Sequence, residues 1–465
     1  MAFEILYLPV GKQMYNLEQA QMKLDDSVQV MKKIDKNILI PDGILLSKED
    51  IDAFLQGKAP DFVIVQTVTY ADASYITEIL RKINCPVLLW SIPEPVVDGL
   101  GIRLNSLSGA YSQANAMLNL GKPYNYVVGS IFADETLDEI KAVVLAAKLK
   151  KSLSRLNLLQ VGSPAEGMGF CNAYENEMMR TFGVKLFNVE IMELMEKART
   201  YDEDAIRDFI FDARNMVPNV FNIERENLFD AGKLFKAYFD YCNEHDIGAV
   251  ASGCCPDFVK KYGTPVCAVL SILNDLGIPA ACEADTYGAL SVFICSYLSK
   301  IPAFFGDPVT IDEEYNSVTY WHCGMAPTSL AREDTKAQAG LHCFSGVGPV
   351  MDFGCRAARH ATVFRIGRKP DGSFRFFIAK GESMDRFKQF TGTTIVIQTE
   401  SNVREVIEKS VASGWEQHFV IAMADISKEL KALAKMLNIE VGRASGKTIQ
   451  STCYNQREIT GISPT

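Results

Sequence analysis

The chain has 465 residues, of which 22% are charged and 48% hydrophobic. This composition is typical of a globular protein, and the length favours two or three domains over a single core. The net charge of −10 is spread along the sequence, which argues against nucleic acid or an anionic membrane as a partner.

The N-terminus lacks a basic segment followed by a long apolar run, so no signal peptide is expected. No apolar run reaches the roughly 20 residues that a membrane-spanning helix needs. The 12 cysteines are scattered and form no CxxC pair, which favours reduced thiols over a disulfide framework. We therefore expect a cytoplasmic protein.

Residues 1–154 alternate short runs rich in Val, Ile and Leu with amphipathic stretches. Strands are expected in EILYLPVG, DFVIVQTV, CPVLLWSIP and YNYVVGS, and helices over residues 71–83 and 137–153. This alternation predicts an N-terminal α/β domain with a doubly wound parallel sheet.

Residues 155–300 repeat the alternation and predict a second doubly wound α/β domain. Its expected strands lie in RLNLLQV, GVKLFNV, IGAVAS and IPAAC. The Gly-rich stretch VGSPAEG follows the first of them, but it is not a GxGxxG dinucleotide-binding motif, and such turns are common at strand ends.

The sequence pattern changes over residues 301–465. Alternating or β-branched runs such as SVTYWHC, ATVFRIGRK, SFRFFIAKG and TTIVIQTE are separated by turn residues. They predict a C-terminal antiparallel β domain, barrel-like in form, which ends with a helix and a strand in KELKALAKMLNIEV.

Two carboxylates stand out in these segments. Glu283 follows the apolar run GIPAAC and precedes Asp285, an expected helix N-cap, which would place Glu283 at the carboxyl edge of a parallel sheet, where such sheets bind ligands. Asp307 lies between Gly306 and Pro308 in a strand pattern. Alternatively, Glu283 is a capping carboxylate and Asp307 a turn residue.

Two of the five histidines are further candidate metal ligands beside these two carboxylates. His322 lies between a strand and a Gly/Pro turn, and His418 opens the strand HFVIAMAD. Either could be a structural histidine instead. Two carboxylates and one or two imidazoles suit a divalent cation such as Mn²⁺ with positions left open for two sugar oxygens. A carboxylate beside the cation could then move the C2 proton of an aldose to C1.

The segments CEADTYGAL, FFGDP, WHCG and GWEQHFVIAMAD resemble the L-fucose/L-arabinose isomerase superfamily. This resemblance implies a Mn²⁺-dependent ketol isomerase that interconverts an aldose and its 2-ketose through a metal-bound ene-diol. Glu283 and Asp307 would be metal ligands and the proton-transfer pair, and His418 a further ligand. His322 would be a fourth ligand or a substrate contact.

The resemblance also implies a homo-oligomer with sites near subunit interfaces. Trp90 resembles an aromatic residue that a neighbouring subunit contributes to the sugar site, although it could equally be a core residue. Divergent members act on 6-sulfonated aldoses such as sulfoquinovose, whose sulfonate could be bound by Arg103, Arg356 or Arg365.

Two other functional classes stay open. A sugar-binding protein would share the paired α/β domains, but the missing export signal and the additional β domain argue against it. A metal-dependent aldolase or epimerase would use similar ligands, and analysis of the product would distinguish it from an isomerase.

Overall fold

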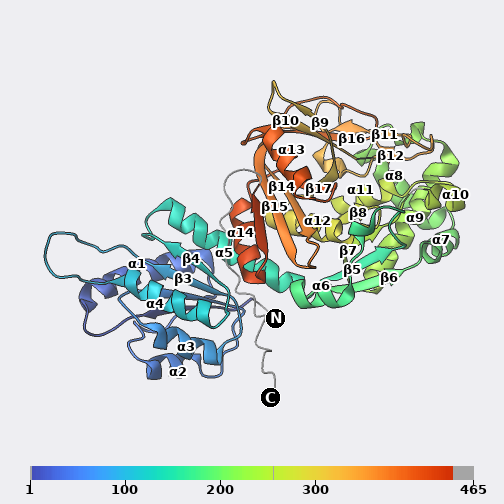
Figure 1. Cartoon of the computed structure of the whole chain (residues 1–465). Helices are drawn as coiled ribbons and strands as arrows, with labels where there is room; N and C mark the ends of the chain where they lie inside the picture. Colours follow the sequence, from blue (N-terminus) through green and yellow to red (C-terminus); the bar gives the residue numbers. More distant parts are fainter. Residues whose placement is uncertain (1–2, 255, 444–465) are drawn as a thin grey trace, which may run out of the picture.

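The computed structural model describes residues 3–254 and 256–443. Figure 1 shows the N-terminal α/β unit to one side of a larger body that holds the rest of the chain. The larger body contains a second parallel sheet and a large mixed sheet.

The first sheet has four parallel strands in the order β1-β2-β3-β4. Every residue of β1, β2 and β3 is buried, because helices and loops cover both faces of the sheet. The strands are β1 (Ile5–Val10), β2 (Phe62–Thr67), β3 (Val87–Ser91) and β4 (Tyr124–Val128). The helices of this unit are α1 (Leu17–Ile34), α2 (Lys48–Leu55), α3 (Ala73–Lys82), α4 (Ser106–Asn119) and α5 (Asp134–Leu153).

The second sheet is also parallel and has the order β6-β5-β7-β8. Its strands are β5 (Asn157–Val161), β6 (Lys185–Val189), β7 (Ile247–Ser252) and β8 (Ala280–Cys282). The α-helices around it are α6 (Glu175–Phe182), α7 (Ile191–Arg199), α8 (Arg207–Met216), α9 (Arg225–Glu244), α10 (Asp257–Tyr262), α11 (Cys267–Asp275) and α12 (Thr286–Ser299). Short 3₁₀ helices lie at η1 (Gly169–Cys171), η2 (Asp204–Ile206) and η3 (Val220–Asn222).

The third sheet has the order β13-β16-β10-β9-β17-β14-β15-β18, and a further pairing of β15 with β16 closes a ring. The strands are β9 (Phe304–Asp312), β10 (Ser317–His322), β13 (Phe353–Gly354), β14 (Ala358–Arg368), β15 (Phe374–Ser383), β16 (Thr393–Thr399), β17 (Phe419–Ala422) and β18 (Glu440–Arg443). The ring strands pair antiparallel, whereas β13 and β18 are added in parallel.

Smaller elements complete this part of the chain: η4 (Thr328–Leu330), the paired short strands β11 (Ala339–Gly340) and β12 (Val350–Met351), and the helices α13 (Val403–Ala412) and α14 (Ser427–Leu437). Helix α14 packs against α5 and β4 and so connects the larger body to the N-terminal unit. In the same contact the Asn125 side chain donates a hydrogen bond to the Ala432 carbonyl oxygen (3.3 Å).

The parallel sheets of the N-terminal half and the large C-terminal sheet agree with the predicted α/β class. The second sheet reverses its strand order at β5, as a doubly wound sheet does, but the first sheet has the sequential order β1-β2-β3-β4, so the prediction of a doubly wound sheet is wrong there. The prediction of an antiparallel, barrel-like C-terminal sheet is wrong at β13 and β18, which pair in parallel, because a local sequence pattern does not reveal the direction in which an edge strand is added. The domain limits at 154/155 and 300/301 stay a prediction, and residues 444–465 of the third segment lie outside the described residues. Within the described chain, no helix has the length and apolar character needed to cross a membrane.

Candidate metal centre

The four predicted ligands come together where the second and third sheets meet. Glu283 directly follows β8 at the carboxyl end of the second sheet, and Asp307 lies within β9. His322 ends β10 and His418 immediately precedes β17, the two strands that flank β9. Side chains up to 135 residues apart in the sequence therefore share one location, since the ligands run from Glu283 to His418.

Strand register explains why the two histidines flank Asp307. Trp321 is paired with Asp307 across β10 and β9, so that His322 follows one position later. Phe419 is paired with Gly306 across β17 and β9, so that His418 lies one position earlier. A Cβ atom at residue 306 would lie 2.6 Å from the Trp321 carbonyl oxygen, which is why glycine is needed for this close approach.

The distances between the polar atoms suit a shared cation. His418 Nε2 lies 3.0 Å from a carboxylate oxygen of Glu283 and 3.6 Å from Oδ1 of Asp307. Potential ligand atoms of Glu283, His322 and His418 all lie within 4.8 Å of one another. Ligands that bind an octahedral cation at about 2.1 Å and at right angles are separated by about 3 Å. The observed spacing is close to this value.

Several of these atoms are buried without a hydrogen-bond partner among the described residues. They are Oδ1 of Asp307 and the Nε2 atoms of His322 and His418. Burying a polar atom without a partner is unfavourable, and three such atoms in one place call for a common explanation. Oxygen and imidazole donors of this kind fit a divalent cation.

A second layer of contacts fixes the His418 ring. The carboxylate of Asp285 accepts a hydrogen bond from His418 Nδ1 (2.8 Å), which directs Nε2 towards Glu283 and Asp307. Two nitrogen atoms of Arg365 on β14 in turn bind both oxygens of Asp285, at 2.5 and 3.2 Å. The side chains of Asp285, Arg365 and His418 are completely buried.

The same contacts set the ionisation of the centre. Burial alone would raise the pKa of Asp285, but Arg365 and His418 lower it to about 2. Burial disfavours the imidazolium of His418, yet the bond to Asp285, with Cys171 and Glu283, raises its pKa well above the usual value. Without a cation, His418 therefore holds a proton, which a cation would displace from Nε2.

The two carboxylates near His418 differ from each other. Burial acts to raise the pKa of Glu283, but its contacts with His418 and His322 bring it below the usual value. Burial raises the pKa of Asp307 above its usual value, because the lowering effect of His322 and His418 is smaller than the effect of burial. Asp307 is thus the carboxyl that takes up a proton more readily.

His322 has a different arrangement from His418. Its Nδ1 atom lies 3.0 Å from the backbone nitrogen of Cys323, which can only donate, so Nδ1 accepts and Nε2 carries the proton of the neutral ring. Burial lowers the pKa of His322 and keeps the ring neutral. In this tautomer the buried Nε2 atom is a hydrogen-bond donor that faces the other groups of the centre.

The backbone at Glu283 is strained. Glu283 and Ala284 both have positive φ angles, 61° and 51°, a region that residues with a side chain seldom adopt. The turn is held by hydrogen bonds from the Ala284 amide to Ser252 (2.9 Å) and from the Asp285 amide to Cys282 (3.1 Å). Asp285 then caps α12 through the Gly288 amide (2.8 Å). This turn directs Glu283 towards β9 while Asp285 stays behind His418.

The loop that follows β5 adds a cover to the centre. Phe170 lies edge-on to the His418 ring with centroids 5.7 Å apart, and Cys171 lies close to Asp285 and His418. Phe305 of β9 contacts both imidazoles, at 4.7 Å from His418 and 5.4 Å from His322. Apolar rings thus enclose the polar atoms and keep the local dielectric low.

Glu283, Asp307, His322 and His418 are therefore adjacent in the structure. Trp90 is not part of this group. Its side chain has 0% exposure in the core of the first unit, and its indole nitrogen donates to the Gly129 carbonyl oxygen (3.0 Å). The expectation that Trp90 contacts a sugar is wrong for this arrangement, because the ring has no surface to offer.

Sequence reasoning missed the role of two residues. Asp285 was expected only as a helix cap, and Arg365 only as an anion contact. Arg365 cannot bind a sulfonate, because its guanidinium is fully buried against Asp285. The doublet of carboxylates in CEAD was a signal for Asp285, but nothing local connects it with Arg365, 80 residues away.

Comparison with known proteins agrees with this geometry. Residues 321–444 match the family described as L-fucose isomerase, C-terminal domain. The chain is 44% identical over 439 residues to a sulfoquinovose isomerase of Clostridium sp. (strain MSTE9), covering 94% of this chain and 98% of that protein. It is 31% identical over 444 residues to the sulfoquinovose isomerase of Priestia aryabhattai and 30% identical over 440 residues to that of Alkalicoccus urumqiensis, with the same coverage.

Proposed function

The chain belongs to the fucose isomerase family, as an aldose–ketose isomerase of the sulfoquinovose isomerase group, and we propose that it converts sulfoquinovose to 6-deoxy-6-sulfofructose with the help of Mn²⁺. The observation that carries the proposal is the convergence of Glu283, Asp307 and His418, with His418 oriented by Asp285. A sugar-binding protein has no need of such a set of unpartnered buried donors.

In this proposal Glu283, Asp307 and His418 hold the cation. Mn²⁺ accepts carboxylate oxygens and imidazole nitrogen, and when bound it polarises the oxygens of an open-chain aldose and makes the C2 proton more acidic. Asp285 acts through His418 and orients its ring, as carboxylates behind metal-binding histidines do.

The carboxylates of Glu283 and Asp307 are the proton-transfer pair. One of them takes the C2 proton, which leaves an ene-diolate, and returns it to C1, while the proton of the C2 hydroxyl passes to O1 and completes the ketose. Asp307 suits this role because its buried Oδ1 atom has no hydrogen-bond partner among the described residues.

His322 is proposed as a substrate contact and not as a metal ligand. Its Nε2–H would donate a hydrogen bond to a sugar oxygen, since the Cys323 amide occupies Nδ1. A neutral donor in this enclosed position can stabilise the charge that develops on that oxygen during proton transfer.

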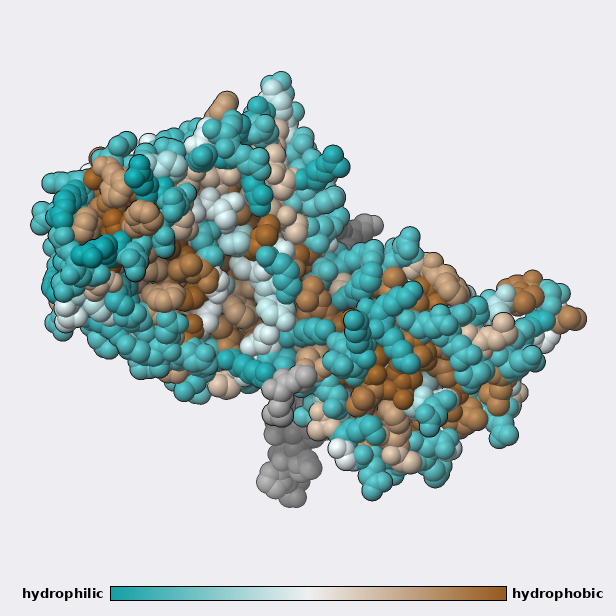
Figure 2. All heavy atoms as spheres, turned by 180° about the vertical axis from the view of Figure 1, so that it is seen from behind, coloured by the Kyte–Doolittle hydropathy of each residue, from teal (hydrophilic) through white to brown (hydrophobic). Residues whose placement is uncertain are grey.

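We further propose that the protein works as a homo-oligomer. In the N-terminal unit, the loop between β3 and α4 exposes Val97 (93%), Leu100 (78%) and Ile102 (62%). Brown hydrophobic areas interrupt the hydrophilic surface on both bodies in Figure 2. Exposed apolar surface of this kind is typical of protein interfaces.

The substrate is tested by comparing sugars that differ only at C6. Sulfoquinovose and glucose share the atoms that react, so any preference reports recognition of the sulfonate. We expect kcat/KM for sulfoquinovose to exceed that for glucose by about 10³-fold or more, because a bound charged group adds several kcal/mol. Equal values would contradict the proposed substrate, while ketose formation from any aldose would still support an isomerase.

The Glu283→Gln variant separates the enzyme from the remaining alternatives. It removes a charge from the cation and a base from the site, and we expect turnover to fall by about 10²–10⁴-fold. A sugar-binding protein would keep its affinity for the sugar in this variant and after chelation. An aldolase would give products with fewer carbons, and an epimerase would give a second aldose.

A further inference from the structure

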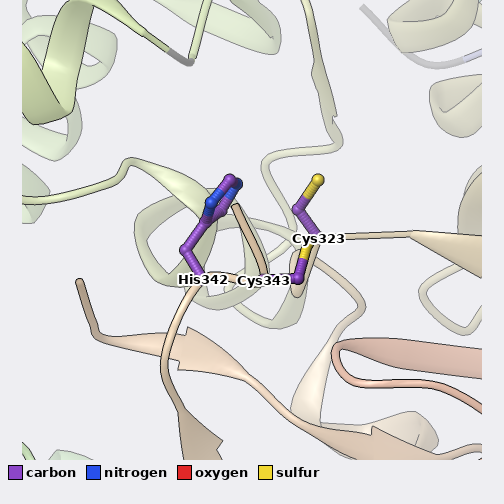
Figure 3. A group of neighbouring side chains, drawn as sticks. All are labelled: Cys323, His342 and Cys343. Atoms are coloured by element: carbon purple, nitrogen blue, oxygen red, sulfur yellow. The ribbon is translucent and has the colours of Figure 1, made fainter. Parts of the chain in front are cut away.

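A second cluster of potential ligands lies beside the metal centre. It consists of Cys323, which directly follows His322 at the end of β10, and of His342 and Cys343 in the loop between β11 and β12. The two Sγ atoms and a ring nitrogen of His342 all lie within 4.8 Å of one another. Figure 3 shows these three side chains beside each other.

The position of His342 suits a metal ligand. The residue is 1% exposed, and its Nε2 atom is buried with no hydrogen-bond partner among the described residues. The loop holds the residue in place, because the His342 amide donates to the Val347 carbonyl oxygen and the Gly346 amide donates to the His342 carbonyl oxygen, both at 2.8 Å.

The tautomer of His342 is less constrained than that of His322. Its Nδ1 atom accepts hydrogen bonds from the backbone amides of Phe344 and Ser345. Both are 3.4 Å long, which is longer than the usual range of about 2.7–3.2 Å for such bonds. The ring can therefore present the nitrogen that a ligand requires at small cost.

Cys323 is buried, with 7% exposure, whereas Cys343 is exposed. The buried thiol is shielded from water, and the exposed thiol gives a metal ion access to the cluster from solvent. The two thiols are close enough to form a hydrogen bond with each other.

We propose that Cys323, His342 and Cys343 form a second metal site, selective for a thiophilic cation of the Zn²⁺ class. Zn²⁺ binds two thiolates and an imidazole at about 2.0–2.3 Å in tetrahedral geometry, which separates the ligand atoms by about 3.5–3.8 Å. Because the ligand atoms of the cluster already lie within 4.8 Å of one another, a contraction of about 1.3 Å at most brings them to this spacing.

The two neighbouring sites differ in ligand chemistry. Glu283 and Asp307 offer hard oxygen donors for Mn²⁺, whereas the cluster offers two soft sulfur donors that Mn²⁺ binds weakly. The cluster therefore selects a different ion from the one held between β8 and β9, and both sites can be filled together.

The test uses the full-length protein with saturating Mn²⁺, to which Cd²⁺ is added as a spectroscopic substitute for Zn²⁺. Binding through sulfur produces the ultraviolet charge-transfer absorption of a Cd²⁺–thiolate bond, which oxygen and imidazole ligands do not give. We expect this absorption to saturate at one equivalent of Cd²⁺, and Zn²⁺ to reverse it by competition.

Variants locate the site. Cys343→Ser, at an exposed position that does not endanger folding, and His342→Gln should each weaken Cd²⁺ binding by about tenfold or more. Cys85→Ser, a half-buried thiol of the N-terminal unit, serves as the control and should leave binding unchanged. Absence of the thiolate absorption at one equivalent, or equal affinity in Cys343→Ser and the unchanged protein, would overturn the proposal.

Discussion

The Nδ1 atom of His418 lies 2.8 Å from Oδ2 of Asp285, and both side chains are fully buried. This contact joins residues 133 positions apart and determines which nitrogen of His418 faces Glu283 and Asp307. Because Arg365 balances the charge of Asp285, the pair can remain ionised inside the protein.

Asp285→Asn tests whether this contact prepares a metal ligand. An amide keeps the size of the side chain but no longer fixes the imidazole tautomer, so metal affinity should fall by about 10–100-fold. Isothermal titration with Mn²⁺ measures the change. Asp312→Asn is the matched control, since Asp312 ends the same strand as Asp307 but, among the described residues, accepts only from the local amides of Glu314 and Tyr315. Unchanged affinity in Asp285→Asn would show that His418 does not depend on Asp285.

His322 and His418 should respond differently to the same substitution. His418→Gln should weaken Mn²⁺ binding by about 100-fold or more, because it removes a ligand. His322→Gln should leave Mn²⁺ affinity within about threefold and reduce kcat, because a neutral donor to the sugar is altered. Metal titration alongside steady-state kinetics separates the two effects. A large loss of metal affinity in His322→Gln would make His322 a ligand and refute its role as a donor.

Metal binding should release a proton. The pKa of His418 is raised well above its usual value by Asp285, Cys171 and Glu283 despite burial, so the ring is protonated before the metal binds. Since the proton and the cation compete for Nε2, Mn²⁺ affinity should rise as pH rises and fall as pH falls. Titration calorimetry in buffers with different ionisation enthalpies counts the released protons. A pH-independent affinity would contradict this assignment, and His418→Gln should lose the effect.

Arg365→Met tests the buried ion pair. Without the guanidinium, the Asp285 carboxylate is left in an apolar interior, and the free energy of unfolding should fall by about 3–5 kcal/mol. Denaturant unfolding measures the loss. Adding Asp285→Asn should recover part of it, because the uncompensated charge is removed. If the two losses were simply additive, Arg365 and Asp285 would not be coupled.

Glu283, Asp307, His322 and His418 were chosen from carboxylate and imidazole groups at strand ends and from the resemblance of their segments to an isomerase family, and the structure brings them together. Their approach to one another depends on the register of β9 with β10 and β17, which local patterns do not specify.

The residues that support the ligands were harder to find. Asp285 and Arg365 are separated by 80 residues, and either one alone resembles an ordinary cap or surface cation. For Trp90 the sequence suggested a contact with the sugar, whereas the structure shows a core residue. A Trp at a strand end has the same sequence context whether it is exposed or buried, and only the packing around β3 shows that it is buried.

The metal centre is tested most directly by ketose formation from sulfoquinovose with the protein treated with EDTA, before and after Mn²⁺ is added back. We expect no 6-deoxy-6-sulfofructose after chelation, recovery with Mn²⁺, and no recovery in Glu283→Gln. Undiminished turnover in the protein shown by elemental analysis to be free of metal would contradict a metal centre at Glu283, Asp307 and His418.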